Sequence, residues 1–323
     1  MASPNLSELI TTTLRNRTGK LADSVSKNNA LLGRLLEKGK VETADGGRTI
    51  VQEIEYAENG TFKRYSGYDI LNITPSDVFT AAEFDWKQAA AAITASGLEQ
   101  MQNSGKEVII KLLAKRIQNA MKTLRNNIAT DCYSDGTADG GKQIGGLQLL
   151  VAATPTSGTV GGINRATWSF WQNQKWGFSA DGSTTASATT IQAGMNALWY
   201  KTVRGSDHVD LIVADNNYYG FYEASLQTIQ RVSNPKMADA GYTTIKYKNA
   251  DVVLDGGYGG GAPASKMYFL NSDYIFLRPH SQRNFVELGG DRMNPNQDAI
   301  VKLIGWMGNM TISNGFLQGV LVA

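Results

Sequence analysis

The sequence predicts an α+β protein built on one long helix. In the 323-residue chain, apolar residues from Gly105 to Asp131 recur at steps of three and four, the spacing of a single buried helical stripe. Short apolar runs alternate with helical patterns over residues 189–280, which predicts a sheet with helices packed against it. A tail of extended segments from Ala299 to Val322 adds strands at the end of the chain.

The composition fits a folded chain long enough for two sizeable cores. Hydrophobic residues make up 42% and charged residues 19%, and the net charge is only +2. Cys132 is the single cysteine, so no intramolecular disulfide can form and an oxidising compartment is not indicated. No signal peptide and no apolar run of about 18 residues is present. We therefore expect synthesis and use in the cytoplasm, or in something assembled there, and no contact with a membrane.

The first 40 residues predict a basic helical arm. Two short amphipathic stripes lie on either side of Gly19, and Pro4 suits a first helical position. Seven bases and three acids give this segment a net charge of +4. Such short helices need the rest of the chain, or another subunit, to bury their apolar faces.

The sequence of residues 41–95 predicts a long two-stranded hairpin that extends from the rest of the chain. Arg48 to Tyr56 alternates apolar and acidic residues, as a half-exposed strand does. In the second segment, Phe79 to Thr94, the alanines from Ala89 to Ala92 favour helix, whereas the aromatic residues favour strand. We predict strand. Because a long isolated hairpin is only marginally stable, we expect this hairpin to pack against another surface.

The helix over Gly105–Asp131 predicts a strut about 40 Å long. Its bases lie largely off the apolar stripe; they include Lys111, Lys115, Lys122 and Arg125. These bases are either a solvated helix face or a surface that attracts nucleic-acid phosphates without sequence preference. The sequence alone supports both readings about equally.

The region after the strut predicts a sheet with helices. Ala166–Trp176 is expected to be a short helix, Thr189–Val203 a longer one, and Val209–Val213 a central strand. Asp215 should cap a further helix that runs through Ile229. Four more extended segments are expected: Tyr242–Tyr247, Val252–Leu254, Met267–Leu270 and Tyr274–Leu277. In the tail, the glycines at 305, 308 and 315 are expected to separate two or three strands.

Two patterns suggest chemistry but have a simpler structural interpretation. His208 lies among acids, beside Asp207, yet a solvated turn is favoured over a proton-transfer pair. Asp131 to Lys142 resembles a calcium loop, but Tyr133 and Lys142 occupy two ligand positions, so a turn that ends the long helix is favoured. With two histidines and one cysteine, an ordinary Cys/His zinc site cannot be built. No cofactor is expected.

The glycine-rich run Gly256–Gly261 suggests a phosphate cradle. It lacks the Lys-Ser/Thr pair of a P-loop, and no dinucleotide fingerprint is present. A loop between two strands is the favoured reading.

The order of these parts resembles the major capsid protein of tailed bacteriophages, the Johnson or Hong Kong ninety-seven-like fold family. Local passages that resemble this family occur along essentially the whole chain. They are YSGYDIL (Tyr65–Leu71), EFDWKQAAAAITASGLE (Glu83–Glu99), NSGKEVI (Asn103–Ile109), YSDGTADGGKQIGGLQ (Tyr133–Gln148), HVDLIVADNNYYGFY (His208–Tyr222) and YKNADVVLDGG (Tyr247–Gly257).

This resemblance implies a phage capsid fold with five parts. They are an N-terminal arm (1–40), an extended E-loop (41–95), a peripheral domain (96–159) with a spine helix (105–131), an axial domain (160–280), and C-terminal strands that return to the peripheral domain (281–323).

The implied function is structural. Many copies would form an icosahedral shell of hexamers and pentamers around double-stranded DNA, assembled in the host cytoplasm and carried in the virion. The expected intersubunit contacts of the E-loop are Glu53, Glu55, Tyr56, Phe62, Lys63, Arg64 and Tyr65. The expected genome-facing bases are Lys111, Lys115, Lys122 and Arg125. The loop at Gly257, Tyr258 and Gly259 would lie near the capsomer centre.

The chain departs from some members of the family at its N-terminus. It begins with a short arm in place of a built-in scaffold of about a hundred residues, so we expect a separate scaffolding protein, or assembly without one. A portal is expected, and a decoration protein is compatible with the pattern. No covalent cross-link is expected, because the Lys–Asn pair of the founding member has no counterpart that we can map.

Two alternative functions remain open from the sequence. The first is an encapsulin, a bacterial compartment on the same fold that holds enzymes. The second is an enzyme that binds a nucleotide in the α/β region, against which the missing phosphate motifs count.

Overall fold

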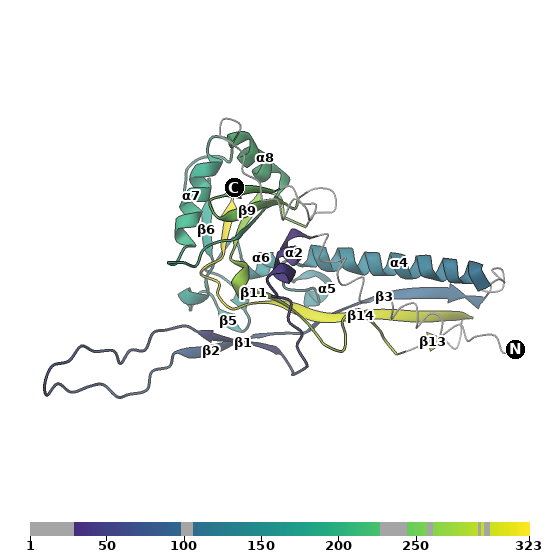
Figure 1. Ribbon diagram of the computed structural model, residues 1–323, viewed down its shortest axis with the longest axis horizontal. Helices are drawn as coiled ribbons and strands as arrows, with labels where there is room; N and C mark the ends of the chain where they lie inside the picture. The colour runs from purple at the N-terminus through teal and green to yellow at the C-terminus, as the bar shows by residue number, and fades with distance from the viewer. Residues whose placement is uncertain (1–28, 98–105, 227–243, 257–260, 290–291, 294–297) are drawn as a thin grey trace.

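The protein consists of a compact body from which two long projections extend in opposite directions. The computed structural model describes residues 29–97, 106–226, 244–256, 261–289, 292–293 and 298–323, with residues 106–115 described as backbone only. In Figure 1 the body lies at the top centre. An arm made of α4, β3 and β14 extends to one side, and the hairpin β1–β2 extends to the other. The first helical stripe of the predicted arm, in residues 1–28, lies outside the described residues.

The long helix predicted from the sequence is present as α4 (Lys106–Asp131). On its described part, Ile117, Met121, Leu124 and Ile128 are buried, which is the predicted stripe. The short helix α2 (Ala30–Glu37) packs beside it. Asn29 joins the two helices: its side-chain oxygen caps the N-terminus of α2, and its Nδ2 donates to the carbonyl of Ala129 at 2.9 Å.

The sheet of the arm has five antiparallel strands and is centred on one of them, β14 (Ala299–Ile312). The glycines at 305 and 308 do not interrupt β14, contrary to the predicted break. Along its length β14 pairs with four strands, which are β3 (Lys87–Ser96), β11 (Ile275–Pro279), β12 (Val286–Glu287) and β13 (Arg292–Met293).

The predicted returning strand over 79–94 is extended, but it divides into two strands with different partners. Its first part, β2 (Phe79–Phe84), pairs with β1 (Ile50–Glu55) in the projecting hairpin. Its second part, β3, leaves the hairpin and joins the sheet of the arm. The two-stranded excursion is therefore shorter than predicted, because its Ala-rich part is paired with β14.

The body contains a six-stranded mixed sheet in the order β6-β15-β10-β7-β9-β8. These strands are β6 (Gln174–Gly177), β7 (Leu211–Ala214), β8 (Thr244–Tyr247), β9 (Ala250–Leu254), β10 (Lys266–Leu270) and β15 (Gly319–Val322). The helices α7 (Ile191–Lys201) and α8 (Asn216–Ser225) cover it (Figure 1). As predicted, Asp215 caps α8, its Oδ1 accepting from the N–H of Tyr218 at 3.0 Å.

Three predicted assignments in this region are wrong. Ala166–Trp176 is not a helix: it holds a single 3₁₀ turn, η1 (Ser169–Trp171), followed by β6. β15 pairs with β10 and β6 and so belongs to the body, not to the sheet of the arm. β11, expected in the body, pairs with β14. The chain therefore crosses between the two sheets at both β11 and β15.

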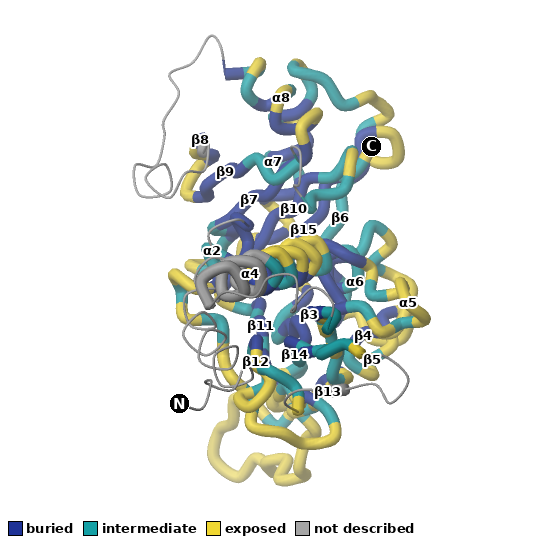
Figure 2. Tube along the Cα trace, turned by 90° about the vertical axis from the view of Figure 1, so that its right-hand side faces the viewer, coloured by how far each residue is buried: buried dark blue, intermediate teal, exposed yellow. Residues whose placement is uncertain are grey.

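The six-stranded sheet separates two apolar cores. Ile212 and Phe269 face the core under α7 and α8, whereas their neighbours Val213 and Tyr268 face a core shared with α2 and α4. This alternation follows from the period of two in a strand, and it explains why these strands read as continuous apolar runs. Figure 2 shows the buried residues concentrated in this body and the exposed ones along the hairpin.

The remaining described elements are short. They are α5 (Ala138–Gly141), α6 (Leu147–Leu150), β4 (Thr159–Val160), β5 (Ile163–Asn164) and η2 (Ser272–Tyr274). In the described part of the chain, no helix has the length and apolarity needed to cross a lipid bilayer.

Candidate assembly interface

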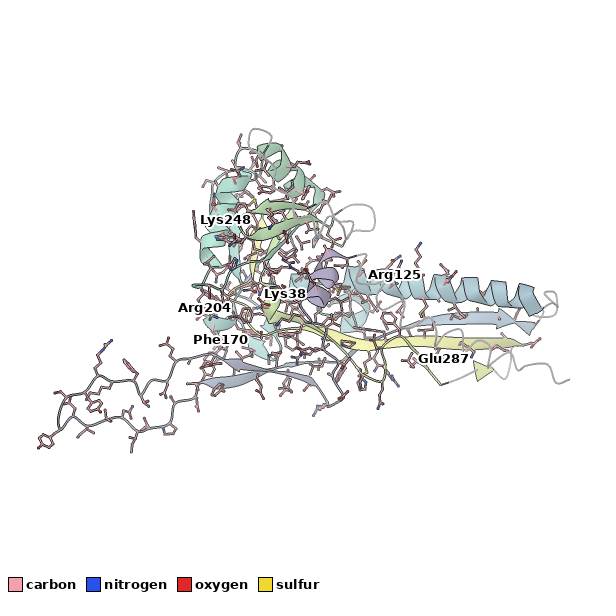
Figure 3. The ribbon with its side chains drawn as sticks, viewed as in Figure 1. Lys38, Arg125, Phe170, Arg204, Lys248 and Glu287 are labelled. Atoms are coloured by element: carbon pink, nitrogen blue, oxygen red, sulfur yellow. The ribbon has the colours of Figure 1, made fainter. Side chains whose placement is uncertain are left out.

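The loop that joins β1 to β2 exposes large apolar side chains. Phe62 is 79% exposed, Ile70 87% and Ile73 91%, and Tyr65 and Tyr68 are exposed beside them. Figure 3 shows the side chains of this loop projecting away from the rest of the molecule. Several large apolar side chains exposed on one projection are typical of a surface that contacts another molecule.

Local contacts give the loop a defined path. The side-chain oxygen of Asn59 accepts from the N–H of Thr61 at 3.0 Å and, across the loop, from the hydroxyl of Ser76 at 3.0 Å. The ammonium of Lys63 donates to the carbonyl of Ile70 at 3.1 Å. The contact of Asn59 with Thr61 forms a turn, whereas the contacts of Ser76 and Lys63 cross the loop, and the apolar side chains remain exposed.

At the root of the loop, an aromatic cluster lines an open groove. Tyr56 stacks on Phe170 with ring centroids 5.2 Å apart and meets Trp168 edge-on at 6.0 Å. The groove has a volume of about 680 Å³, and Phe170, Trp171 and the exposed Phe316 are among its lining residues. Figure 3 places Phe170 just above the point where the hairpin leaves the body. The aromatic packing fixes the start of the projection.

Backbone and side-chain hydrogen bonds also hold the hairpin at its root. The N–H of Glu83 donates to the carbonyl of Gly161 at 2.9 Å. The Arg278 guanidinium donates to Oε1 of Gln52 at 2.9 Å, which ties β1 to β11. The hairpin is thus anchored to both the body and the arm, while its exposed tip forms no hydrogen bond with the described residues outside the loop.

Most of the predicted intersubunit residues lie together on this projection. Six of them are exposed on β1 or on the loop: Glu53, Glu55, Phe62, Lys63, Arg64 and Tyr65. The guanidinium of Arg64 lies over the ring of Phe62, 5.6 Å from its centroid. Tyr56 differs, because its ring is half-buried in the aromatic cluster of its own chain.

The predicted genome-facing bases are described only in part. Lys122 is exposed on α4, whereas Arg125 is half-buried, and its Nε is buried without a hydrogen-bond partner among the described residues. The side chains of Lys111 and Lys115 lie outside the described residues, as do Gly257, Tyr258 and Gly259.

The residues of the first pattern that suggested chemistry make local contacts with their sequence neighbours. Asp207 pairs with Arg204, Nη2 to Oδ2 at 2.9 Å, and this contact lowers the pKa of Asp207. His208 contacts the carbonyl of Ser206 through Nδ1 at 2.9 Å. Both groups are therefore engaged in a surface turn, as the favoured reading predicted.

The carboxylates of the calcium-like segment are occupied locally. Oδ1 of Asp131 accepts from Nε2 of Gln143 at 2.7 Å, and Oδ1 of Asp135 accepts from the N–H of Thr137 at 3.0 Å. Among the described residues, no cluster of three or more His, Cys, Asp or Glu side chains has metal-binding geometry. Cys132 is buried, and burial raises the pKa of its thiol to about 12, which leaves the sulfur protonated and unreactive.

The sequence did not predict the polar junction between α2 and the sheet of the body. The guanidinium of Arg34 on α2 bonds to Oδ2 of Asp210 at 3.0 Å and to Oδ2 of Asp251 at 3.3 Å. Lys38, labelled in Figure 3, pairs with the same Asp210 at 3.3 Å. Because these residues are up to 217 positions apart, no local pattern in the sequence indicates that they meet.

Comparison with solved structures identifies the fold. The chain is similar to the capsid asymmetric unit of cyanophage A-1(L), with a TM-score of 0.60 and 16% identity over 88% of this chain and 90% of that chain. It is also similar to the capsid of Myoviridae phage XM1, with a TM-score of 0.52 and 12% identity over 90% of this chain and 91% of that one. A third match is the holo-SrpI encapsulin complex of Synechococcus elongatus PCC 7942, with a TM-score of 0.54 and 8% identity over 90% of this chain and 86% of that one.

No family model matches the sequence, and no curated protein matches it. At these identities the solved structures define the fold alone. The chain has the mixed α and β fold of phage capsid proteins, as the resemblance predicted. The Johnson, or Hong Kong ninety-seven-like, fold is therefore confirmed for this chain.

Proposed function

We propose that this protein is a major capsid protein, many copies of which assemble into a closed icosahedral shell. The observation that carries the proposal is the loop between β1 and β2. Its aromatic and aliphatic side chains are exposed at the end of a projection that leaves the body, while the root of the projection is fixed by packing. The fold, shared with subunits of capsids, supports the same reading.

In the proposed shell, the loop acts as a clamp on a neighbouring copy. A closed shell repeats one contact many times, so each contact can be weak and the assembly still stable. The aromatic rings of Phe62 and Tyr65 serve as anchors, and the acids Glu53 and Glu55 meet bases on the neighbour. Tyr56 contributes indirectly, because its ring holds the root of the clamp.

The five parts expected from the resemblance belong to this proposal. The hairpin and its loop are the E-loop, α4 is the spine of a peripheral domain, and the body is an axial domain near the capsomer centre. Because Lys87–Ser96 pairs with β14, we assign residues 87–95, which were expected in the E-loop, to the peripheral sheet in this proposal. A portal belongs to the same proposal, together with a separate scaffolding protein or assembly without one, and a decoration protein is compatible with it.

The direct test is electron microscopy and sedimentation of the expressed chain, alone and with its presumed scaffold. Shells, tubes or capsomers are the expected products. A chain that sediments as a monomer under every condition, with no particles in the microscope, overturns the proposal.

The content of the particle separates the two shell functions. We infer that the shell encloses double-stranded DNA, with Lys122 contributing a phosphate contact that has no sequence preference. The match to an encapsulin supports the alternative, in which the shell is a compartment for enzymes. Particles purified from an infected or lysogenic host should contain nuclease-protected DNA. Particles that contain a defined cargo protein and no DNA support the alternative.

We propose no catalytic activity for the chain. The nucleotide-binding enzyme remains testable in a thermal-shift screen, because a bound ligand stabilises the folded state by mass action. Saturable stabilisation by one nucleotide would support that enzyme and count against the present proposal.

A further inference from the structure

In the part of the chain that the structure describes, one edge of the sheet in the arm has no neighbouring strand and lies beside the long helix. Among the described strands, β3 pairs with β14 along its whole length and with no other strand. A groove of about 520 Å³ lies against β3, between the backbone of residues 90–94 and one flank of α4. On the helix side the groove is lined by Arg116, Asn119, Ala120, Thr123, Leu124 and Asn127.

One hydrogen bond shows which backbone groups of β3 face this groove. The carbonyl of Thr94 accepts from Nη1 of Arg116 on α4 at 2.7 Å, so the polar groups of Thr94 point away from β14. In an antiparallel strand, the N–H and C=O of one residue point to the same edge, and successive residues alternate between edges. The N–H and C=O groups of Ala90 and Ala92 therefore also point toward the groove.

The side chains along this edge leave room for another strand. Ala90, Ala92 and Thr94 are small and exposed. An unpaired edge of this length is a template for strand addition unless something covers it, and between Lys87 and Ser96 the strand carries no charge that would block pairing. A strand edge beside a helix flank is the geometry in which extended peptides bind by β-augmentation.

The loop of the hairpin offers a matching segment. Among the described contacts, the backbone N–H groups of Ile70, Leu71 and Ile73 have no hydrogen-bond partner. Ile70 and Ile73 are 87% and 91% exposed, and isoleucine favours extended structure. Residues 70–74 thus combine backbone N–H groups that have no described hydrogen-bond partner with apolar side chains that are exposed to solvent.

The two surfaces lie at opposite ends of one molecule. Figure 1 shows the loop extending away from the body in the direction opposite to β3 and α4. A subunit therefore cannot pair its own loop with its own β3. Two complementary surfaces at opposite ends produce a head-to-tail contact, which generates rings when the rotation between copies closes.

We propose that residues 70–74 of one copy add as a strand to the β3 edge of a neighbouring copy, in the groove beside α4. The inference rests on the proposed shell function and names the surface that the clamp grips. The backbone supplies the hydrogen bonds, with the carbonyls and N–H groups of Ala90 and Ala92 as partners. The apolar side chains of Ile70 and Ile73 become covered by the neighbour.

Disulfide trapping tests the contact directly. A preparation with Ala92→Cys is mixed with one carrying Asn72→Cys or Ile73→Cys, assembled, oxidised and run on a non-reducing gel. Adjacent residues of a strand face opposite sides, so one of the two loop variants presents its sulfur on the side of Ala92. We expect covalent dimers with one of them. Tyr200→Cys, on the exposed face of α7, is the control and should give no dimer with Ala92→Cys.

A second pair of variants tests the backbone hydrogen bonds. Ala92→Pro removes an N–H that points away from β14, so β3 should stay paired with β14, while strand addition loses a donor. We expect a folded subunit with a wild-type circular dichroism spectrum and at least a tenfold lower yield of shells. Ala92→Val keeps the N–H and should assemble normally.

The outcomes separate this inference from the function on which it rests. Wild-type shells without a cross-link between Ala92→Cys and either loop variant overturn the inference and leave the capsid function intact. Normal shell yield from Ala92→Pro has the same meaning. Protection of the Ala90 and Ala92 amides from hydrogen exchange in shells without that cross-link assigns the groove to another segment and also overturns it. If the wild-type chain forms no shell at all, that result overturns the proposed function and this inference with it.

Discussion

The hydroxyl of Tyr133, just after α4, donates a hydrogen bond to Oδ2 of Asp255, which directly follows β9. The backbone N–H of Ala30 on α2 also bonds to this carboxylate. One carboxylate thus joins the helix of the arm, the short helix α2 and the sheet of the body. Burial raises the pKa of Asp255 to about 6, and the two hydrogen bonds oppose this shift without cancelling it.

This raised pKa predicts a pH dependence of subunit stability. The folded state holds the proton of Asp255 more tightly than the unfolded state, in which the pKa lies near 3.8. The contribution to stability is therefore complete below pH 4 and is lost as the pH rises through about 6. In Asp255→Asn, denaturant unfolding between pH 4 and 7 should lose this component. An unchanged pH profile in the variant would show that Asp255 does not titrate in this range.

Removing the donor should weaken the same junction. Tyr133→Phe keeps the ring in place but leaves the carboxylate of Asp255 with one donor fewer. Loss of one partner of a buried polar group costs about 1–3 kcal/mol, so the midpoint of urea unfolding should fall accordingly. Tyr200→Phe, on an exposed ring of α7, is the matched control and should leave the midpoint unchanged.

The ion cluster at α2 predicts a larger loss of stability. Arg34 is only 12% exposed and pairs with Asp210 and Asp251, so Arg34→Ala removes one cation from both carboxylates, while Asp210 keeps its pair with Lys38. Removing one partner of such a buried pair should lower the unfolding free energy by roughly 3 kcal/mol. Lys122→Ala, which removes an exposed lysine on α4, should change it by less than about 0.5 kcal/mol. Equal effects of the two substitutions would contradict the importance of the cluster.

Local patterns predicted the elements whose formation depends on neighbouring residues. The stripe ending at Ile128 predicted α4, because helical spacing is a local property, and Asp215 predicted the start of α8 through its capping side chain. The exposure of Phe62 and Tyr65 was also predictable. Aromatic residues in a turn-rich segment that projects from the body have no apolar core nearby in which to be buried.

Pairing between distant segments was not predictable from the sequence. Ala95 pairs with Ile300, and no local pattern specifies a partner so far along the chain. The glycines of β14 were expected to break the strand, yet Gly308 is required for close packing: a Cβ there would lie 2.7 Å from the carbonyl oxygen of Arg278. The contact of Tyr133 with Asp255 was missed for the same reason, since the residues are 122 positions apart.

The root of the hairpin depends on one glycine with a left-handed backbone. Gly161 has a φ of 57°, and a Cβ at this position would lie 2.8 Å from the Cβ of Ala82 and 3.1 Å from the ring of Phe84. Gly161→Ala therefore combines backbone strain with overpacking and should destabilise the subunit by about 1–3 kcal/mol. Limited proteolysis should cut the loop between β1 and β2 faster in this variant. Gly158 has a φ of 85°, but no atom lies within 4 Å of an added Cβ. Gly158→Ala therefore measures the cost of backbone strain without overpacking.

Replacing the loop tests the clamp without disturbing the rest of the fold. The N–H of Tyr56 donates to the carbonyl of Val78 at 3.0 Å, so the two ends of the loop are already adjacent. Substituting Asn-Gly for residues 57–77 should close β1 and β2 into a short hairpin. Because the loop contributes almost nothing to the described cores, the unfolding midpoint should change by no more than a few degrees. Sedimentation should show a folded subunit that forms no shells. Shells of normal size from this variant would mean that copies associate through other surfaces, and the loop would then have no role as a clamp.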